Sequence, residues 1–218
     1  MLALPSVVDM TSIASITLDV ADPSAAERFY ADAFGLDDGR LNLRASEAPT
    51  SGFRGFTLSL VVGQPADVRG LFDSAVAAGA TALKPVSKSM WGYGATVQAP
   101  DGTIWKIATS AKKDAGPATR HIDSIVLLLG VADVAASKRF YVEHGLAVGK
   151  SFGRMYVEFA ADAAPVKLGL YRRRALAKDA GVAADGSGSH RLAIAGTGGS
   201  FTDPDGFPWE PATAAAAA

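Results

Sequence analysis

The chain carries the same two sequence motifs twice, in the same order. Residues 20–30 read VADPSAAERFY, and residues 131–141 read VADVAASKRFY. A second motif, PDG followed by two residues and Trp, occupies residues 100–105 and again 204–209. Two motifs that recur in one order indicate a duplicated structural unit, and this repeat constrains the fold more than any other feature.

Length and charge narrow the class of protein. The chain has 218 residues, with 21 Lys plus Arg against 22 Asp plus Glu, and that balance argues against a nucleic-acid or anionic-membrane surface. The absence of cysteine excludes disulfides and thiolate metal sites. The longest apolar run, residues 125–132, is far shorter than the roughly 20 residues that span a bilayer. We therefore expect a cytoplasmic protein with no nucleic-acid and no membrane partner.

The first half predicts elements in the order β-α-(short β)-β-α-β-β-β. An alternating apolar pattern predicts a strand over residues 13–20. Asp22-Pro23 then predicts a helix start, and Gly35 predicts its end near Phe34. The remaining elements are expected at residues 56–62 (strand), 67–78 (helix), 95–98 (strand) and 104–109 (strand).

The second half repeats this order with a deletion. We expect strands at residues 122–129, 152–159, 166–171 and 191–195, a helix over 133–144, a long loop over 175–189, and a last strand after the turn at 204–206. Nothing in this half corresponds to the helix over 67–78.

The repeat and these elements divide the chain into domains. The prediction is a first domain over 1–110 with its first module shortened, a linker over 111–119, a second domain over 120–211 without its second helix, and a disordered alanine tail over 212–218. Whether the modules pair within each half or across the halves is left open.

A strand ending in Val-x-Asp, a helix carrying Phe-Tyr, a Gly-Leu pair and a closing Asp-Pro-Asp-Gly-x-x-Trp-Glu resemble the vicinal oxygen chelate superfamily, which includes glyoxalases, bleomycin resistance proteins and extradiol dioxygenases. The matching stretches are residues 20–36, 131–146 and 203–210. The resemblance covers nearly the whole chain. It implies an α+β fold of tandem glyoxalase-like domains, built from βαβββ modules whose curled mixed sheets form cups.

The resemblance also implies where a divalent metal would bind, but the residues there depart from the usual His, Gln and Glu. In the first half those positions fall on Ser15, Gly55 and Lys106. In the second half they fall on Ser124 or Val126, on Leu170 or Tyr171, near His190, and on Glu210. Strand alternation points His190 away from the cup. His190 and Glu210 together are fewer than the three protein ligands of a typical catalytic site. No cofactor is therefore expected.

The cups remain candidate sites for a small molecule. The first-half candidates are Ser15, Thr17, Asp19, Thr57, Ser59 and Lys106, with Trp91 and Tyr93 as a rim on the loop between helix and strand. Asp19 and Lys106 are expected to pair. The second-half candidates are Tyr156, Glu158, Tyr171, Arg191 and Glu210.

Three functions stay open. The leading hypothesis is a metal-independent small-molecule binder of the glyoxalase and bleomycin-resistance type, or a degenerate enzyme. The alternative is a metal-dependent lyase, isomerase or dioxygenase using His190 and Glu210. The third is a protein-interaction module whose exposed strand edges dock a partner or a second copy as a homodimer.

Overall fold

The computed structural model describes residues 11–36, 39–161 and 164–212. The first half forms β1 (Ile13–Val20), α1 (Pro23–Phe34), β2 (Leu41–Ala45), β3 (Thr50–Gly52), β4 (Phe56–Val61), α2 (Pro65–Ala77), β5 (Thr81–Ser89), β6 (Gly92–Gln98) and β7 (Ile104–Thr109). The second half forms β8 (Ser124–Val131), α3 (Val134–Glu143), β9 (Val148–Phe152), β10 (Tyr156–Phe159), β11 (Val166–Arg172), α4 (Arg173–Ala180), β12 (Gly186–Gly188), β13 (Leu192–Gly196), β14 (Phe201–Thr202) and β15 (Pro208–Pro211). The predicted disordered tail lies outside the described residues, apart from Ala212.

The repeated aspartate of the first motif starts a helix in each half. The Asp22 side chain accepts a hydrogen bond from the Ala25 N–H at 2.9 Å, and Asp133 accepts one from the Ala135 N–H at 2.8 Å. Such caps satisfy amide donors that the first helical turn leaves without partners. Hydrogen bonds from the Ala136 and Ala135 N–H groups lower the pKa of Asp133. Gly35, with φ 68°, ends α1 in the left-handed conformation that favours glycine.

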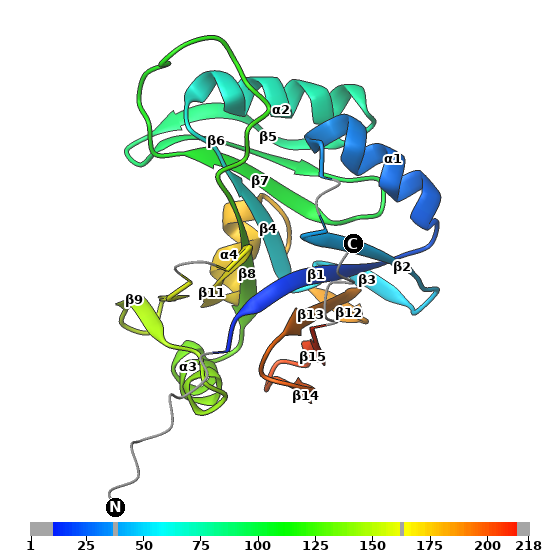
Figure 1. Cartoon of the computed structure of the whole chain (residues 1–218), viewed down its shortest axis with the longest axis vertical. Coiled ribbons are helices and arrows are strands. Elements are labelled where there is room, and N and C mark those ends of the chain that lie inside the picture. Colours follow the sequence, from blue (N-terminus) through cyan, green and yellow to red (C-terminus); the bar gives the residue numbers. More distant parts are fainter. Residues whose placement is uncertain (1–10, 37–38, 162–163, 213–218) are drawn as a thin grey trace, which may run out of the picture.

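The strands pair across the two halves of the sequence. An inner half-sheet runs in the order β5-β6-β7-β4-β8-β11-β10-β9, and an outer half-sheet contains β2, β1, β13, β15 and β14. β4 of the first half pairs antiparallel with β8 of the second, and β1 pairs antiparallel with β13. Ile13 opposite Val166 joins the two half-sheets. The pairing that the sequence left open is therefore across the halves (Figure 1).

The helices of the repeat cover one face of the inner half-sheet. α2 packs on β5, β6 and β7, α1 lies beside α2 and also contacts β2, and α3 packs on β10 and β11 (Figure 1). The strand residues on this face, including Leu58, Trp105 and Leu127, are completely buried. The main hydrophobic core lies between these helices and the sheet.

The tyrosine of the first motif and the tryptophan of the second meet in this core. The Tyr30 hydroxyl donates to Asp101 Oδ2 at 2.6 Å and accepts from Trp105 Nε1 at 3.4 Å. The two motifs therefore build the fold together, which explains why they recur as a pair.

The second copy keeps this arrangement but changes its carboxylate. The Tyr141 hydroxyl donates to Asp203 Oδ2 at 2.7 Å and accepts from Trp209 Nε1 at 3.4 Å. Asp203 precedes the proline of the turn, whereas Asp101 follows it. We call the Tyr-Asp-Trp sets of the two halves the tyrosine clamps.

Three sequence predictions of secondary structure were wrong or incomplete. The loop expected at 175–189 contains the end of α4 and the short strand β12, because Leu176, Ala177 and Ala180 form an apolar face that packs on Phe53 and Ile104. The strand expected at 152–159 is a hairpin of β9 and β10, and β5 adds an edge strand that was given no bounds. As expected, no helix stands between β13 and β14, whose connecting residues are all described.

Candidate functional site

The face of the inner half-sheet opposite α1, α2 and α3 is only partly covered, and we call it the open face. Successive side chains of a strand alternate between faces, so residues that stand opposite one another in the ladder share a face in rows. One row crosses six strands and carries three lysines. This lysine row consists of Lys84, Thr96, Lys106, Ser59, Val126 and Lys167, in order across β5, β6, β7, β4, β8 and β11.

The next row of the open face carries small side chains. This small-residue row consists of Ser87, Gly94, Ala108, Val61 and Ser124, in order across β5, β6, β7, β4 and β8. A Cβ added to Gly94 would meet only the Ile107 carbonyl oxygen, at the ordinary contact distance of 3.7 Å. The row therefore leaves free space above the sheet.

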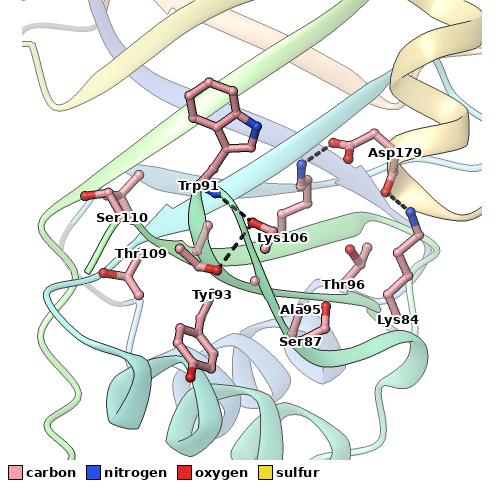
Figure 2. Close-up of a pocket in the computed structure, with 15 residues that line it drawn as sticks. Lys84, Ser87, Trp91, Tyr93, Ala95, Thr96, Lys106, Thr109, Ser110 and Asp179 are labelled. Carbon is pink, nitrogen blue, oxygen red and sulfur yellow. Dashed lines mark hydrogen bonds and ion pairs between the residues drawn. The ribbon is translucent and has the colours of Figure 1, made fainter. Parts of the chain in front are cut away.

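The lysine row has the small-residue row on one side. Helix α4 covers the part of the open face on its opposite side. Its buried Leu176 packs in a small second core that includes Leu128 and Tyr171. Its carboxyl end reaches the lysine row, where Lys106 forms an ion pair with the Asp179 carboxylate. Lys84 Nζ donates to the carbonyl oxygens of Lys178 at 3.0 Å and Asp179 at 2.5 Å. A cation there also interacts favourably with the negative end of the helix dipole. Figure 2 shows both lysines extending toward Asp179.

Two adjoining cavities occupy the rest of the open face. The first has a volume of about 520 Å³ and lies over β5, β6 and β7, with Lys106, Asp179 and Trp91 in its lining. The second has a volume of about 750 Å³ and lies toward β9, β10 and β11, with Lys167 and Glu158 in its lining. Volumes of this order are typical of small-molecule sites.

The residues predicted for this region differ in burial and in whether they line the first cavity. Lys106 lines the first cavity, Ser59 lies in the same row at 8% exposure, and Thr57 is completely buried. Trp91 lies in the turn between β5 and β6 and is 82% exposed at the cavity rim (Figure 2). Tyr93 lies on β6 and points the other way, toward the helices. Neither residue therefore lies on a loop between helix and strand, as had been expected; Trp91 stands at the rim, and Tyr93 contributes to the cavity lining although its ring points toward the helices.

Tyr156, Glu158 and Tyr171 lie on the same open face, on β10 and β11. The Tyr156 hydroxyl donates to Glu158 Oε2 at 3.0 Å, and the Tyr156 and Tyr171 rings stand 5.8 Å apart. Burial raises the pKa of Tyr156, and the neighbouring Glu158 charge raises it further. These residues therefore lie on the same sheet face as Thr57, Ser59 and Lys106 of the first half, which the half-by-half grouping had separated.

The remaining first-half candidates lie on the outer half-sheet. Ser15, Thr17 and Asp19 alternate along β1, and Ser15 accepts a hydrogen bond from Asn42 Nδ2 at 3.0 Å. The sequence predicted a pair between Asp19 and Lys106, and that prediction was wrong. Asp19 pairs with Arg44 of β2, because β1 and β2 are neighbours and β7 lies in the other half-sheet.

Arg44 takes the position between the two acidic candidates of the outer half-sheet. Its Nε lies 2.7 Å from Asp19 Oδ1, and its Nη1 lies 2.9 Å from Glu210 Oε1. Hydrogen bonds to Asp19 and then to Glu210 raise the Arg44 pKa. A permanently charged guanidinium thus stands where these two carboxylates would otherwise receive a metal ion.

His190 and Arg191 have structural roles at the start of β13. His190 stacks on Phe207 with ring centroids 4.0 Å apart. Its Nδ1 lies 2.5 Å from the Arg54 carbonyl oxygen and its Nε2 lies 3.0 Å from the Asp205 carbonyl oxygen. Carbonyl oxygens require N–H donors, which a metal-bound nitrogen cannot supply. Arg191 adopts φ 55° and donates to the Ser46 carbonyl oxygen.

The donor set does not fit the divalent metal that the resemblance implies. In the inner half-sheet Lys106 shares its row with Ser59, Val126 and Lys167, so Lys167 stands in this row on β11, where the module-end position had been expected near Leu170 or Tyr171. In the outer half-sheet Ser15, Ala195 and Glu210 share one row. Ammonium groups and alkyl side chains offer a cation no lone pair. Within residues 11–36, 39–161 and 164–212, no three His, Cys, Asp or Glu side chains form a metal-binding group.

Comparison with known proteins supports the fold. Glyoxalase I from Zea mays superposes with a TM-score of 0.59 at 16% identity, covering 91% of this chain and 91% of that chain. A putative dioxygenase from Bacillus subtilis superposes with a TM-score of 0.52 at 14% identity, covering 84% of this chain and 69% of that chain. No protein-family model and no curated protein matches the sequence significantly. The predicted α+β glyoxalase-like fold is confirmed.

Sequence reasoning missed four residues of these sites. Arg44 lies in a short strand with little apolar pattern, and Asp179 lies in the segment expected as a loop. Lys84 lies in the edge strand that was given no bounds. Lys167 could have been found, because alternation along β11 places it on the face of Tyr171. None of the helices in the described ranges is long and apolar enough to cross a membrane.

Proposed function

We propose that this chain binds a small molecule on the open face of the inner half-sheet, without a metal ion. The observation that carries the proposal is the pair of adjoining cavities over the lysine row and the small-residue row. Lys106 and Lys167 at the equivalent metal-ligand positions support binding through protein side chains alone. The fold shared with glyoxalase I supports a ligand site on a curled sheet.

A compound screen with a cavity-filling variant tests this proposal. A bound compound should raise the midpoint of thermal unfolding by about 5–10 °C at one hundred times its Kd. Gly94→Leu places a side chain in the first cavity without backbone strain, because Gly94 does not adopt a positive φ. The variant should lose the shift for compounds held in that cavity.

Gly116→Leu is the matched control, because a Cβ at Gly116 meets no atom within 4 Å. It adds the same side chain away from both cavities and should keep the shift. A screen in which no compound stabilises the wild-type protein would count against the proposal. So would shifts that Gly94→Leu and Gly116→Leu preserve equally.

Elemental analysis of the dialysed protein tests metal independence. We expect no stoichiometric zinc, nickel, manganese or iron, because lysines occupy ligand positions and Arg44 bridges Asp19 and Glu210. A metal retained at one equivalent, and lost together with Glu210→Gln, would revive the metal-dependent lyase, isomerase or dioxygenase alternative.

Association of two copies is a second candidate function. Large apolar side chains are exposed at the turns of the two hairpins that end the inner half-sheet. They are Met90 (78%), Trp91 (82%), Phe152 (64%) and Met155 (61%). Exposed apolar patches of this kind commonly mark interaction sites. Analytical ultracentrifugation should then detect a dimer that Phe152→Ser weakens, and a monomer at high concentration would refute this candidate.

A further inference from the structure

We propose that the first cavity takes a small organic acid, whose carboxylate binds Lys106 in competition with the Asp179 carboxylate of α4. The inference rests on the proposed function, because it names the ligand class of the same site.

The charge of the open face favours an anion. Lys84 and Lys106 both line the first cavity, and Asp179 is the one carboxylate among its lining residues. Lys167 continues the same row beyond Val126, but it lines the second cavity, together with Glu158. A ligand that brings a carboxylate therefore meets cations that the protein only partly neutralises.

Asp179 stands where the ligand's carboxylate would bind. Its side chain is 48% exposed, whereas that of Lys106 is 23% exposed, so the carboxylate approaches the lysine from the solvent side. It can be displaced without moving α4, because Leu176 and Ala180 remain buried and Lys84 still binds the carbonyl oxygens at the helix end. The ion pair between Lys106 and Asp179 is thus the same kind of contact that the carboxylate of an acidic ligand would make with Lys106.

The apolar part of the cavity suits a flat ring. Gly94, Ala108 and Val61 present little side-chain volume beside the lysine row. The exposed Trp91 indole at the rim offers an aromatic surface on which a second ring can stack. An aromatic or other planar carboxylic acid matches both the charge and the shape of the cavity.

The experiment compares 2-naphthoate with 2-naphthamide, which has nearly the same shape without the charge. Titration calorimetry of the intact chain measures the Kd of each compound. We expect the acid to bind at least about tenfold more tightly than the amide, because a hydrogen bond to a charged group is stronger than a neutral one. Added salt should weaken binding of the acid more than that of the amide.

Three variants locate the charge that recognises the acid. Lys106→Gln should weaken 2-naphthoate binding by about tenfold or more. Lys88→Gln removes the same charge from β5 on the opposite face, beside Tyr93, and should leave the Kd unchanged. Asp179→Asn removes the internal competitor and should tighten binding roughly two- to fivefold, the scale of an exposed ion pair. It also keeps a test available if Lys106→Gln fails to fold.

Each outcome separates the ligand class from the proposed function. Binding of the acid to Asp179→Asn alone would support internal competition. Equal Kd values for acid and amide, or an unchanged Kd in Lys106→Gln, would overturn the inference, while amide binding that Gly94→Leu abolishes would still support a small-molecule site. Binding of neither compound to either wild type or Asp179→Asn would overturn the inference, and the wider compound screen would then decide the proposed function.

Discussion

Removing one hydroxyl from the second tyrosine clamp should destabilise the protein by a predictable amount. In Tyr141→Phe the ring stays in the core, but Asp203 Oδ2 loses the donor that lies 2.7 Å away. Tyr141 is completely buried and Asp203 is only 4% exposed, so water cannot easily replace the lost donor. The other carboxylate oxygen keeps the N–H groups of Asp205 and Phe207, so Asp203 loses one hydrogen bond, and Trp209 Nε1 loses the longer one that it donates to the hydroxyl at 3.4 Å.

A hydrogen bond to a charged group contributes about 1.5–3 kcal/mol to the free energy of unfolding. For a chain of this length, each kcal/mol lowers the unfolding midpoint by about 2–4 °C. Tyr141→Phe should therefore lower the midpoint by about 3–12 °C. Urea titration and calorimetry measure both quantities.

Tyr30→Phe is the matched comparison, because Tyr30 makes the same bond to Asp101 at 2.6 Å. Asp101 is only partly buried, so water can solvate it after the substitution. We expect Tyr30→Phe to cost about 0.5–1.5 kcal/mol, less than Tyr141→Phe. An equal or larger cost at Tyr30 would refute the reasoning that burial of the acceptor sets the cost.

The cost of Tyr141→Phe should also depend on pH. Burial raises the Asp203 pKa above its ordinary value of 3.8, and the hydrogen bond from Tyr141 lowers it. A carboxyl with a raised folded-state pKa binds its proton more tightly when folded, so stability falls as pH rises from 3.8 through that pKa. Losing the hydroxyl raises the pKa further. The difference between variant and wild type should therefore be larger at neutral pH than near pH 4, and a cost independent of pH would contradict this.

Four further substitutions test the packing of the open face and the outer half-sheet. Gly130→Ala on β8 should cost about 1–3 kcal/mol, because its Cβ would lie 2.9 Å from the backbone carbonyl oxygen of Gly55. Gly94→Ala should cost little, because its nearest neighbour is at 3.7 Å, and equal unfolding midpoints for the two variants would contradict the packing argument. Leu176→Ala should cost about 2–5 kcal/mol in urea titration if α4 is docked as described, since the side chain is 1% exposed. Arg44→Met should cost no more than about 1 kcal/mol despite its two ion pairs, because the Arg44 side chain is 47% exposed; a larger loss in the same assay would show that the bridge is a stabilising element.

Local patterns in the sequence were enough to find most elements of the fold. The alternation over residues 13–20 and the Asp22-Pro23 cap depend on neighbours in the chain, so β1 and α1 appear with the expected bounds. The helix α4 was missed because only Leu176, Ala177 and Ala180 of its short span are apolar and buried. Its stability comes from packing on Phe53, which lies in the other half of the chain.

The candidate site was harder to predict, because alternation gives the face of a side chain but not its neighbouring strand. Alternation assigned the side chains of Asp19 and Lys106 to a face of their strands. However, β1 and β7 lie in different half-sheets, and each residue pairs with a partner that the sequence did not suggest. Strand order depends on contacts between distant segments. The resemblance predicted the modules but not which strands are neighbours. That Lys167 stands opposite Val126 is visible only in the strand pairing of the structure.

The crosswise strand pairing has a consequence for how the chain reaches its native state. The inner half-sheet closes when β4 pairs with β8, and α2, β5, β6, β7 and the segment after β7 lie between them in the chain. The outer half-sheet closes only when β1 meets β13, with most of the chain between them. Closing a longer loop costs more entropy, and distant contacts slow folding. We therefore expect β4, β8 and β11 to pair during synthesis, before β13 has been made and can pair with β1. The order of synthesis would then set the order in which the two half-sheets form.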